Sequence, residues 1–239
     1  MPILRAQQLE KSFLFQGEIS KVLKGINLEL QEGEFVSIVG ASGCGKTTLL
    51  EILAGITFSD NGSIYYMDRD ITCKAGYLGY MPQSDMLFPW LKVIDNILLP
   101  AKIRGGDTKQ EKRKALDLLP IFGLEDYAEY LPWQLSGGLR QRVALARTYM
   151  TGSKVWLLDE PLANLDAITR NSLQDWIASI VYSLNLSVLL VTHDIEEAIK
   201  LSDRIEVMKN GIFTGHICVD KTDNENGRRD LVNSIRSML

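Results

Sequence analysis

The chain has 239 residues, of which 46% are hydrophobic and 23% charged, so its composition is that of an ordinary folded protein and excludes a disordered one. The formal net charge of −4 argues against nonspecific nucleic-acid binding, because phosphate contacts need clustered Lys and Arg. The length fits one large α/β domain or a domain with an inserted subdomain.

The cysteine content and the hydropathy indicate in which cellular compartment the chain is expected. Cys44, Cys73 and Cys218 are odd in number and lack metal-ligand spacing, which predicts free thiols in a reducing compartment. No apolar run reaches the roughly 18 residues of a transmembrane helix, and the N-terminus lacks the layout of a signal peptide. We therefore expect a cytosolic chain that at most docks onto a membrane.

The first thirty residues predict antiparallel strands. Apolar and polar residues alternate towards Leu30, and Phe35–Val39 then reads as a buried strand. Phe13 has two interpretations, an aromatic ring that stacks on a purine or ordinary sheet packing.

A glycine-rich loop follows this buried strand and precedes a helical pattern. Its residues are Gly40, Ala41, Ser42, Gly43, Cys44, Gly45, Lys46, Thr47 and Thr48. Strand, glycine loop and helix in this order predict a phosphate-binding loop, whose backbone N–H groups point at one anion. Lys46 can then reach the β- and γ-phosphates of a nucleotide, and the Thr47 hydroxyl can ligate Mg²⁺.

The middle of the chain changes from strand to helix patterning. Residues 60–62 predict a turn into a strand at 63–67, and a further strand at 76–81 ends just before Gln83. From residue 84 to about 150 the pattern is helical, with an apolar stripe at Ala115, Leu118, Leu119 and Phe122. This part predicts an inserted helical subdomain.

The second half alternates strands and helices again. Buried strands at 155–158 and 187–192 end in Asp159-Glu160 and in His193, and the helix between them has a single apolar face. Asn210-Gly211 predicts a type I′ hairpin turn, and the tail from Asp220 predicts a terminal helix with a solvated face. Because ligands gather at the carboxyl ends of parallel strands, the polar residues are expected at one edge of the sheet.

Asp159, Glu160 and His193 are the candidates for chemistry at that edge. Asp159 can hold Mg²⁺ through water, and Glu160, one residue closer to the γ-phosphate, can polarise the attacking water. His193 can hydrogen-bond the γ-phosphate, although a lone histidine is more often structural.

A second anion site is predicted at residues 135–142, which read Leu-Ser-Gly-Gly-Leu-Arg-Gln-Arg. The Ser136 hydroxyl and the amides of Gly137 and Gly138 stand at a helix N-terminus. One nucleotide cannot obviously contact both the glycine loop and this second anion site of the same subunit, which suggests two chains meeting face to face. The alternative is a glycine turn in which Ser136 only caps the helix.

These motifs together resemble the nucleotide-binding subunit of an ABC transporter, over residues 3 to about 218. Gly-Ala-Ser-Gly-Cys-Gly-Lys-Thr-Thr resembles its Walker A loop, Val-Trp-Leu-Leu-Asp-Glu-Pro its Walker B strand, and Leu-Ser-Gly-Gly-Leu-Arg-Gln-Arg its signature. Gln83 falls at the Q-loop, residues 163–166 at the D-loop and His193 at the switch histidine, and Phe13 matches the aromatic that stacks on adenine.

The resemblance implies a P-loop NTPase (RecA-like) fold with a mainly parallel sheet, an antiparallel β subdomain and an inserted helical subdomain. The core would comprise residues 1–83 and 151–219, the helical subdomain 84–150 and the tail 220–239. It also implies a sandwich dimer with two ATP molecules and Mg²⁺ at the interface. Each ATP would lie between the Walker A loop of one chain and Ser136 and Gly138 of the other, with Asp166 among the nucleotide-binding residues and Gln83 touching the metal.

The resemblance further implies that dimer closure drives a transmembrane permease at the cytoplasmic face of the membrane. Residues 86–90, Met-Leu-Phe-Pro-Trp, resemble a segment of the importers of nitrate, sulfonate, taurine, bicarbonate and vitamin precursors. This apolar segment predicts a docking surface for the permease, or else packing within the helical subdomain. Other subunits, including a solute-binding protein, would choose the solute.

Two departures from the family pattern and two alternative functions remain. Asn164 stands where the family usually has Ala, and Thr148-Tyr149 replace Ala-Leu after the signature helix. A soluble ABC ATPase without a transport role is the main alternative. A small-molecule kinase has no use for the signature.

Overall fold

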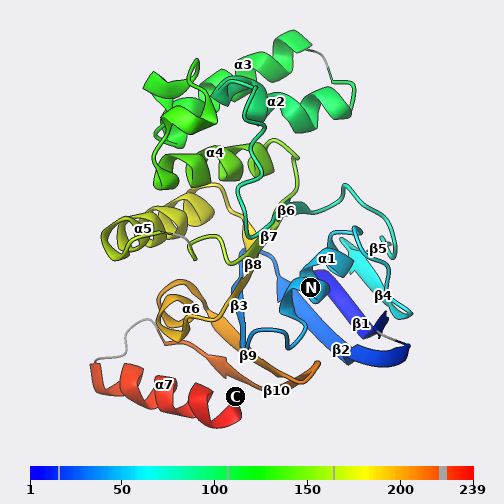
Figure 1. Ribbon diagram of the computed structural model, residues 1–239. Helices are drawn as coiled ribbons and strands as arrows, with labels where there is room; N and C mark the ends of the chain where they lie inside the picture. The colour runs from blue at the N-terminus through cyan, green and yellow to red at the C-terminus, as the bar shows by residue number, and fades with distance from the viewer. Residues whose placement is uncertain (16, 107, 164, 221–224) are drawn as a thin grey trace.

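The computed structural model describes residues 1–15, 17–106, 108–163, 165–220 and 225–239. Its strands form two sheets, a four-stranded sheet in the order β2-β1-β4-β5 and a six-stranded sheet in the order β10-β9-β3-β8-β7-β6 (Figure 1). Helices α2, α3 and α4 gather at one end of the molecule, beyond the edge strand β6, and α7 lies at the other end beside β10 (Figure 1).

The four-stranded sheet consists of β1 (Pro2–Phe15), β2 (Glu18–Gln31), β4 (Asn61–Tyr66) and β5 (Arg69–Asp70). Each pair in it is antiparallel, which confirms the prediction for the first thirty residues. The expected turn at 60–62 is wrong, because Asn61 already pairs with Glu10 of β1. Gly62 extends the strand at a φ of 95°, where a Cβ atom would overlap the Gln7 carbonyl oxygen.

The six-stranded sheet consists of β3 (Phe35–Gly40), β6 (Gly79–Met81), β7 (Val155–Asp159), β8 (Ser187–Thr192), β9 (Arg204–Lys209) and β10 (Ile212–Cys218). All neighbours run parallel except β10 against β9, so the mainly parallel sheet is confirmed. The strand expected at 76–81 is three residues long, because only residues 79–81 pair with β7.

The parallel register brings the strand ends together. Val39 pairs with Thr192, Asp159 with Val191 and Met81 with Leu158. Strands β3, β6, β7 and β8 therefore all end at the same edge, and the segments that follow them meet there.

The helices are α1 (Lys46–Leu53), α2 (Val93–Ile103), α3 (Thr108–Ile121), α4 (Gly137–Tyr149), α5 (Ala167–Ser183), α6 (Ile195–Leu201) and α7 (Glu225–Met238). Two 3₁₀ turns, Glu125–Tyr127 and Pro132–Gln134, lie between α3 and α4. The short helix α6 was not expected from the sequence. Within the described residues, no helix is both long and apolar enough to span a bilayer.

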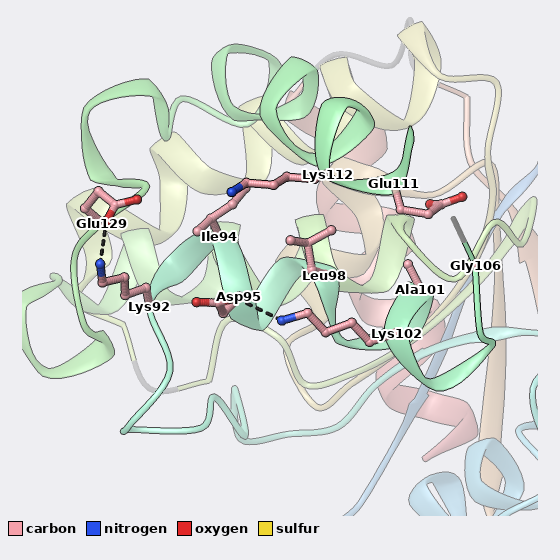
Figure 2. Close-up of a pocket in the computed structure, with 10 residues that line it drawn as sticks. All are labelled: Lys92, Ile94, Asp95, Leu98, Ala101, Lys102, Gly106, Glu111, Lys112 and Glu129. Carbon is pink, nitrogen blue, oxygen red and sulfur yellow. Dashed lines mark hydrogen bonds and ion pairs between the residues drawn. The ribbon is translucent and has the colours of Figure 1, made fainter. Parts of the chain in front are cut away.

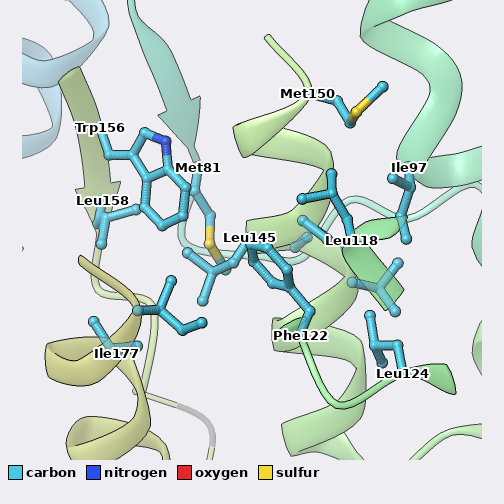
Figure 3. Packing of buried hydrophobic residues seen from close by; sticks show 14 of the residues in the cluster. Met81, Ile97, Leu118, Phe122, Leu124, Leu145, Met150, Trp156, Leu158 and Ile177 are labelled. Atoms are coloured by element: carbon cyan, nitrogen blue, oxygen red, sulfur yellow. The ribbon is translucent and has the colours of Figure 1, made fainter. Parts of the chain in front are cut away.

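One hydrophobic core joins the helical end of the molecule to the sheet. Phe122, just after α3, and Leu145 of α4 are fully buried in the same cluster as Trp156 and Leu158 of β7, as Figure 3 shows. The predicted apolar stripe of α3 is buried along its whole length, which confirms the helix face. Because the core is continuous, movement of these helices relative to the sheet requires repacking at this boundary.

Helix α7 also packs against the fold. Ile235 is fully buried among β9 and α6 residues, and the Thr214 hydroxyl of β10 donates to the Met238 carbonyl at 3.2 Å. The terminal helix is therefore confirmed, but one of its faces is core and only the other is solvated.

The hairpin turn between β9 and β10 docks onto the glycine loop. Asn210 and Gly211 both have positive φ angles, 50° and 81°, as a type I′ turn requires. The Gly211 N–H donates to the Cys44 carbonyl at 3.1 Å, and its carbonyl accepts from the Lys24 N–H at 3.0 Å. A Cβ atom on Gly211 would overlap the Val22 carbonyl oxygen, so this turn closes only around glycine.

Replacing Gly211 with Ala tests this close approach, with Gly152→Ala as the matched control. Both glycines have positive φ, but a Cβ atom on Gly152 meets nothing within 4 Å. We expect Gly152→Ala to lower the free energy of unfolding by about 1 kcal/mol, from backbone strain alone. Gly211→Ala adds a backbone clash of a further ~1–3 kcal/mol, measured by urea unfolding. Equal losses in the two variants would contradict the docking of this turn.

Candidate functional site

The glycine loop between β3 and α1 is enclosed by neighbouring backbone. A Cβ atom on Gly40 would overlap the Met208 carbonyl and crowd the Cys44 thiol. Gly45, at the N-cap of α1, has a φ of 111°, and its Cα faces the Val22 carbonyl and the Leu23 side chain. Side chains at these two positions would displace β2 or β9, so the loop shape depends on both glycines.

Lys46 is folded back over this loop. Its side chain is only 5% exposed, and Nζ donates to the carbonyls of Gly40 at 2.8 Å and Ala41 at 2.9 Å. The Cys44 sulfur lies 4.0 Å from the same ammonium. The hydrogen-bond acceptors of this buried ammonium are neutral carbonyls, which favours an anion in the loop.

Thr47 and Asp159 form an oxygen pair beside the loop. The Thr47 hydroxyl of α1 donates to Asp159 Oδ1 at 3.2 Å, and Asp159 is 1% exposed at the end of β7. Burial raises the pKa of Asp159, and the neighbouring Glu160 raises it further, while the Thr47 hydrogen bond and the positive charge of Lys46 lower it. A hydroxyl and a carboxylate are oxygen donors of the kind that Mg²⁺ prefers, so the pair fits that ion.

Glu160 lies at the centre of the polar cluster. Its carboxylate Oε2 accepts from Gln83 Nε2 at 3.3 Å and lies 3.1 Å from His193 Nδ1. The Glu160 backbone has a φ of 43°, and its N–H donates to the Val191 carbonyl of β8 at 2.9 Å. A non-glycine residue keeps this strained backbone conformation only where surrounding contacts enforce it. Here the conformation directs the Glu160 carboxylate towards Gln83, which follows β6, and His193, which follows β8.

The predicted second anion site is a capped helix start in this structure. Ser136 is the N-cap of α4, and its hydroxyl accepts from the Leu139 N–H at 3.3 Å. Cβ atoms on Gly137 and Gly138 would press on Leu165 and Thr169. In the part of the chain that the structure describes, no hydrogen bond joins Ser136, Gly137 or Gly138 to residues 40–48.

Asp166 and Phe13 lie in two further places. Asp166 caps α5, its Oδ1 accepting from the Thr169 N–H at 3.0 Å, and these hydrogen bonds lower its pKa. Asn164, the noted departure in the D-loop, lies outside the described residues. Phe13 is 42% exposed on β1, with Lys11 Nζ 5.3 Å from its ring centre, so the ring is not part of the buried sheet face.

The residues that enclose the glycine loop were not predicted from the sequence. Val22, Leu23, Met208 and Gly211 come from β2 and from the β9–β10 hairpin, which are distant in sequence. The Asn210-Gly211 signal predicted a turn, but nothing in the sequence indicated where that turn docks. Trp133 was also missed and is 71% exposed, just before the Ser136 cap.

A cavity of about 390 Å³ lies between α2 and α3, away from this cluster (Figure 2). Its charged residues largely pair with one another, Lys92 with Glu129 and Lys102 with Asp95 (Figure 2). Its floor carries the side chains of Ile94 and Leu98. Because these charges are paired, we assign no role to the cavity.

The fold and the loop geometry define a P-loop nucleotide-binding α/β protein. Residues 23–163, more than half of the chain, match the family described as ABC transporter. The chain belongs to this ABC transporter family.

Two of the curated relatives have names that state what they transport. The chain is 42% identical over 208 residues to the bicarbonate transport ATP-binding protein CmpC of Synechococcus elongatus, covering 86% of this chain and 31% of that protein. It thus spans about a third of the length of CmpC. It is 44% identical over 192 residues to the aliphatic sulfonates import ATP-binding protein SsuB 2 of Agrobacterium fabrum, covering 80% of this chain and 72% of that protein.

A similar solved structure is a dimeric ATP-binding cassette in a post-hydrolysis state, bound to ADP and Pi. It has a TM-score of 0.79 and 30% sequence identity to this chain, and the match covers 91% of this chain and 99% of that one.

Asp159→Asn tests the electrostatics of the buried oxygen pair. Because burial raises the pKa of Asp159, the folded protein binds its proton more tightly than the unfolded chain, so stability falls as pH rises through the unfolded pKa. Removing the charge should therefore raise the Tm of the ligand-free protein at neutral pH by about 2–4 °C, or about 1 kcal/mol. Scanning calorimetry at low and neutral pH checks this.

The difference between variant and wild type should shrink towards low pH, where Asp159 is protonated in both states. If the Asp159→Asn variant has a lower Tm than the wild type at neutral pH, the buried Asp159 charge does not destabilise the fold.

Proposed function

We propose that this chain binds and hydrolyses ATP as the energy-supplying subunit of an ABC importer of a small solute. The observation that carries the proposal is the Glu160 carboxylate, which contacts Gln83 and His193 beside the Thr47–Asp159 pair. Family membership supports it, because the matched family is that of ABC transporters.

The glycine loop would bind the phosphates of ATP. The amides of residues 40–48 surround the anion, and Lys46 moves from the Gly40 and Ala41 carbonyls to the β- and γ-phosphates. Thr47 and Asp159 would hold Mg²⁺, with Gln83 as a further ligand. The ion, when bound, neutralises charge that develops on the phosphate oxygens.

Glu160 would act as the base. Its carboxylate accepts a proton from the attacking water, and the Gln83 amide and the His193 ring fix its orientation. The His193 side chain is 58% exposed, so its ring is free to turn towards the γ-phosphate once ATP is present. Three strand ends thus supply the base and its two orienting groups.

A second copy of the chain would complete each site. Ser136, Gly137, Gly138 and Asp166 of that copy would face the γ-phosphate, and Phe13 of the first copy would stack on adenine. The dimeric state of a similar cassette supports this arrangement. Because the γ-phosphate supplies the contacts that differ between open and closed dimers, ATP would favour closure and hydrolysis would favour opening.

The permease would dock onto the exposed aromatic segment after Gln83. Met86 is 63% exposed, Phe88 41% and Trp90 71%, although all three are apolar or aromatic. Docking there would put the chain at the cytoplasmic face of the membrane, with the helical part, residues 84–150, as the subdomain that meets the permease. Relatives named for bicarbonate and sulfonates suggest a small anionic solute, delivered by a solute-binding protein.

Glu160→Gln should slow ATP turnover by roughly a hundredfold or more and trap an ATP-bound dimer, because the amide cannot take the proton. Glu32→Gln is the control, since Glu32 pairs with Lys154 at the amino-terminal edge of the sheet. Phosphate release and size-exclusion chromatography with ATP measure both effects. Near-normal turnover in Glu160→Gln would reject Glu160 as the base.

Trp90→Ala should weaken attachment to membranes that contain the permease by about tenfold, as expected for a buried aromatic anchor. Tyr182→Ala is the control, because Tyr182 is 90% exposed on α5. Co-purification from detergent-solubilised membranes with a multi-span protein measures attachment. Co-purification with soluble proteins alone would favour an ABC ATPase without a transport role.

A further inference from the structure

The turn between β9 and β10 contacts two distant parts of the fold through one residue. Gly211 donates its N–H to the Cys44 carbonyl of the glycine loop at 3.1 Å. Its own carbonyl accepts from the Lys24 N–H of β2 at 3.0 Å. The Gly211 Cα also faces the Val22 carbonyl so closely that a side chain would not fit. The turn therefore lies between β2 and the glycine loop and is bonded to both.

The parallel register of β3 and β9 brings this turn to the loop. Gly40, the last residue of β3, pairs with Met208, which lies one residue before the end of β9. A Cβ atom on Gly40 would overlap the Met208 carbonyl, so the two backbones are in direct contact there. The chain continues from β3 into the glycine loop and from β9 into the turn. The hydrogen bond from Gly211 to Cys44 thus joins two segments that leave the sheet at the same point.

The hydrogen bond to Cys44 fixes the direction of the next N–H group. The described chain contains no cis peptide bond, so the Cys44 carbonyl and the Gly45 N–H point in opposite directions across one rigid plane. Because the turn holds the carbonyl, the Gly45 N–H points away from the turn. In the part of the chain that the structure describes, this N–H donates to no protein oxygen. The Cys44 N–H, in contrast, donates to the Ala41 carbonyl at 3.3 Å.

We infer that the β9–β10 turn is part of the phosphate site and that Gly211 is a positioning residue for it. By holding the Cys44 carbonyl from outside the loop, Gly211 keeps the Gly45 N–H directed towards the phosphate that the loop binds. This inference rests on the proposed function, in which residues 40–48 bind the phosphates of ATP. Gly211 touches no nucleotide and acts only through Cys44.

The glycine at position 45 explains why the loop needs such an outside contact. Rotation of the peptide plane between Cys44 and Gly45 changes the φ angle of Gly45, and glycine tolerates a wide range of φ at little cost. The loop requires this glycine, because a side chain there would press on Leu23 and the Val22 carbonyl. The residue that lets the loop form therefore leaves its own N–H free to rotate, and the Gly211 hydrogen bond removes that freedom.

Replacing Gly211 with glycolic acid in the full chain tests the inference without adding a side chain. The peptide bond between Asn210 and Gly211 becomes an ester, which has no N–H and whose oxygen repels the Cys44 carbonyl. We expect the affinity for ADP with Mg²⁺, measured by equilibrium dialysis, to fall about tenfold, as for the loss of one hydrogen bond to a charged group. The affinity for inorganic pyrophosphate should fall by the same factor, because the change lies at the phosphates.

Glycolic acid in place of Gly152 is the matched control. Gly152 also has a positive φ, a Cβ atom there meets nothing within 4 Å, and its N–H donates to the Tyr149 carbonyl at 3.0 Å. This ester removes the same kind of hydrogen bond at the end of α4, so the affinity for ADP should change by less than about twofold. Thermal unfolding of both esters identifies the temperature below which each is folded, and binding is measured there.

Amide hydrogen exchange of the unmodified protein gives a second measurement. If docking of the turn strengthens phosphate binding, phosphate must strengthen docking by the same factor. Saturating ADP should therefore slow exchange of the Gly211 N–H about tenfold more than exchange of the Gly152 N–H. General stabilisation by the ligand slows both amides alike and cancels in this comparison.

Three results would overturn the inference. They are an unchanged ADP affinity in the Gly211 ester, equal slowing of exchange at Gly211 and Gly152, and a loss of ADP affinity without a loss of pyrophosphate affinity. Failure of the proposed function shows differently, as a wild-type protein that binds neither ADP nor pyrophosphate, or as a Glu160→Gln variant with normal turnover.

Discussion

The parallel register of β3, β6, β7 and β8 is the constraint on which the site depends. Because Val39 pairs with Thr192 and Asp159 with Val191, the residues that follow these strands meet at one edge of the sheet. A slip of one residue in β7 would turn Asp159 to the other face of the sheet. The buried apolar pairs along each strand fix this register, so core packing sets the geometry of the polar cluster.

Sequence predicted the parts of the site better than their assembly. Lys46, Asp159, Glu160 and His193 follow strands or glycines whose local patterns are strong, and the structure brings Glu160 and His193 together as strand order implies. The docking of the β9–β10 turn on the glycine loop was not predictable, because Gly211 contacts Cys44 and Lys24 across most of the chain. Such contacts follow from tertiary packing, which local periodicity does not encode.

The errors in the fold that was predicted from the sequence have local causes. The turn expected at 60–62 is absent because Gly62 permits close approach to β1, and an isolated glycine signals a turn and a crowded strand alike. Helix α6 escaped notice because it has only seven residues, shorter than the window over which helical periodicity is recognised. Asp194 caps that helix by accepting from the N–H groups of Glu196 and Glu197.

The electrostatics support the proposal that one chain holds only part of a nucleotide site. Lys46 and Asp159 are both almost fully buried, one against carbonyl oxygens and the other beside a hydroxyl, and the charge of Lys46 offsets only part of the effect of burial on Asp159. Ser136 and Asp166, in contrast, already cap helices and satisfy local N–H groups. In the proposed function, a nucleotide would therefore gain most of its binding free energy from the first set and a smaller, conditional amount from the second. That asymmetry would make binding to one chain the initial step and closure of two chains the step that depends on the γ-phosphate.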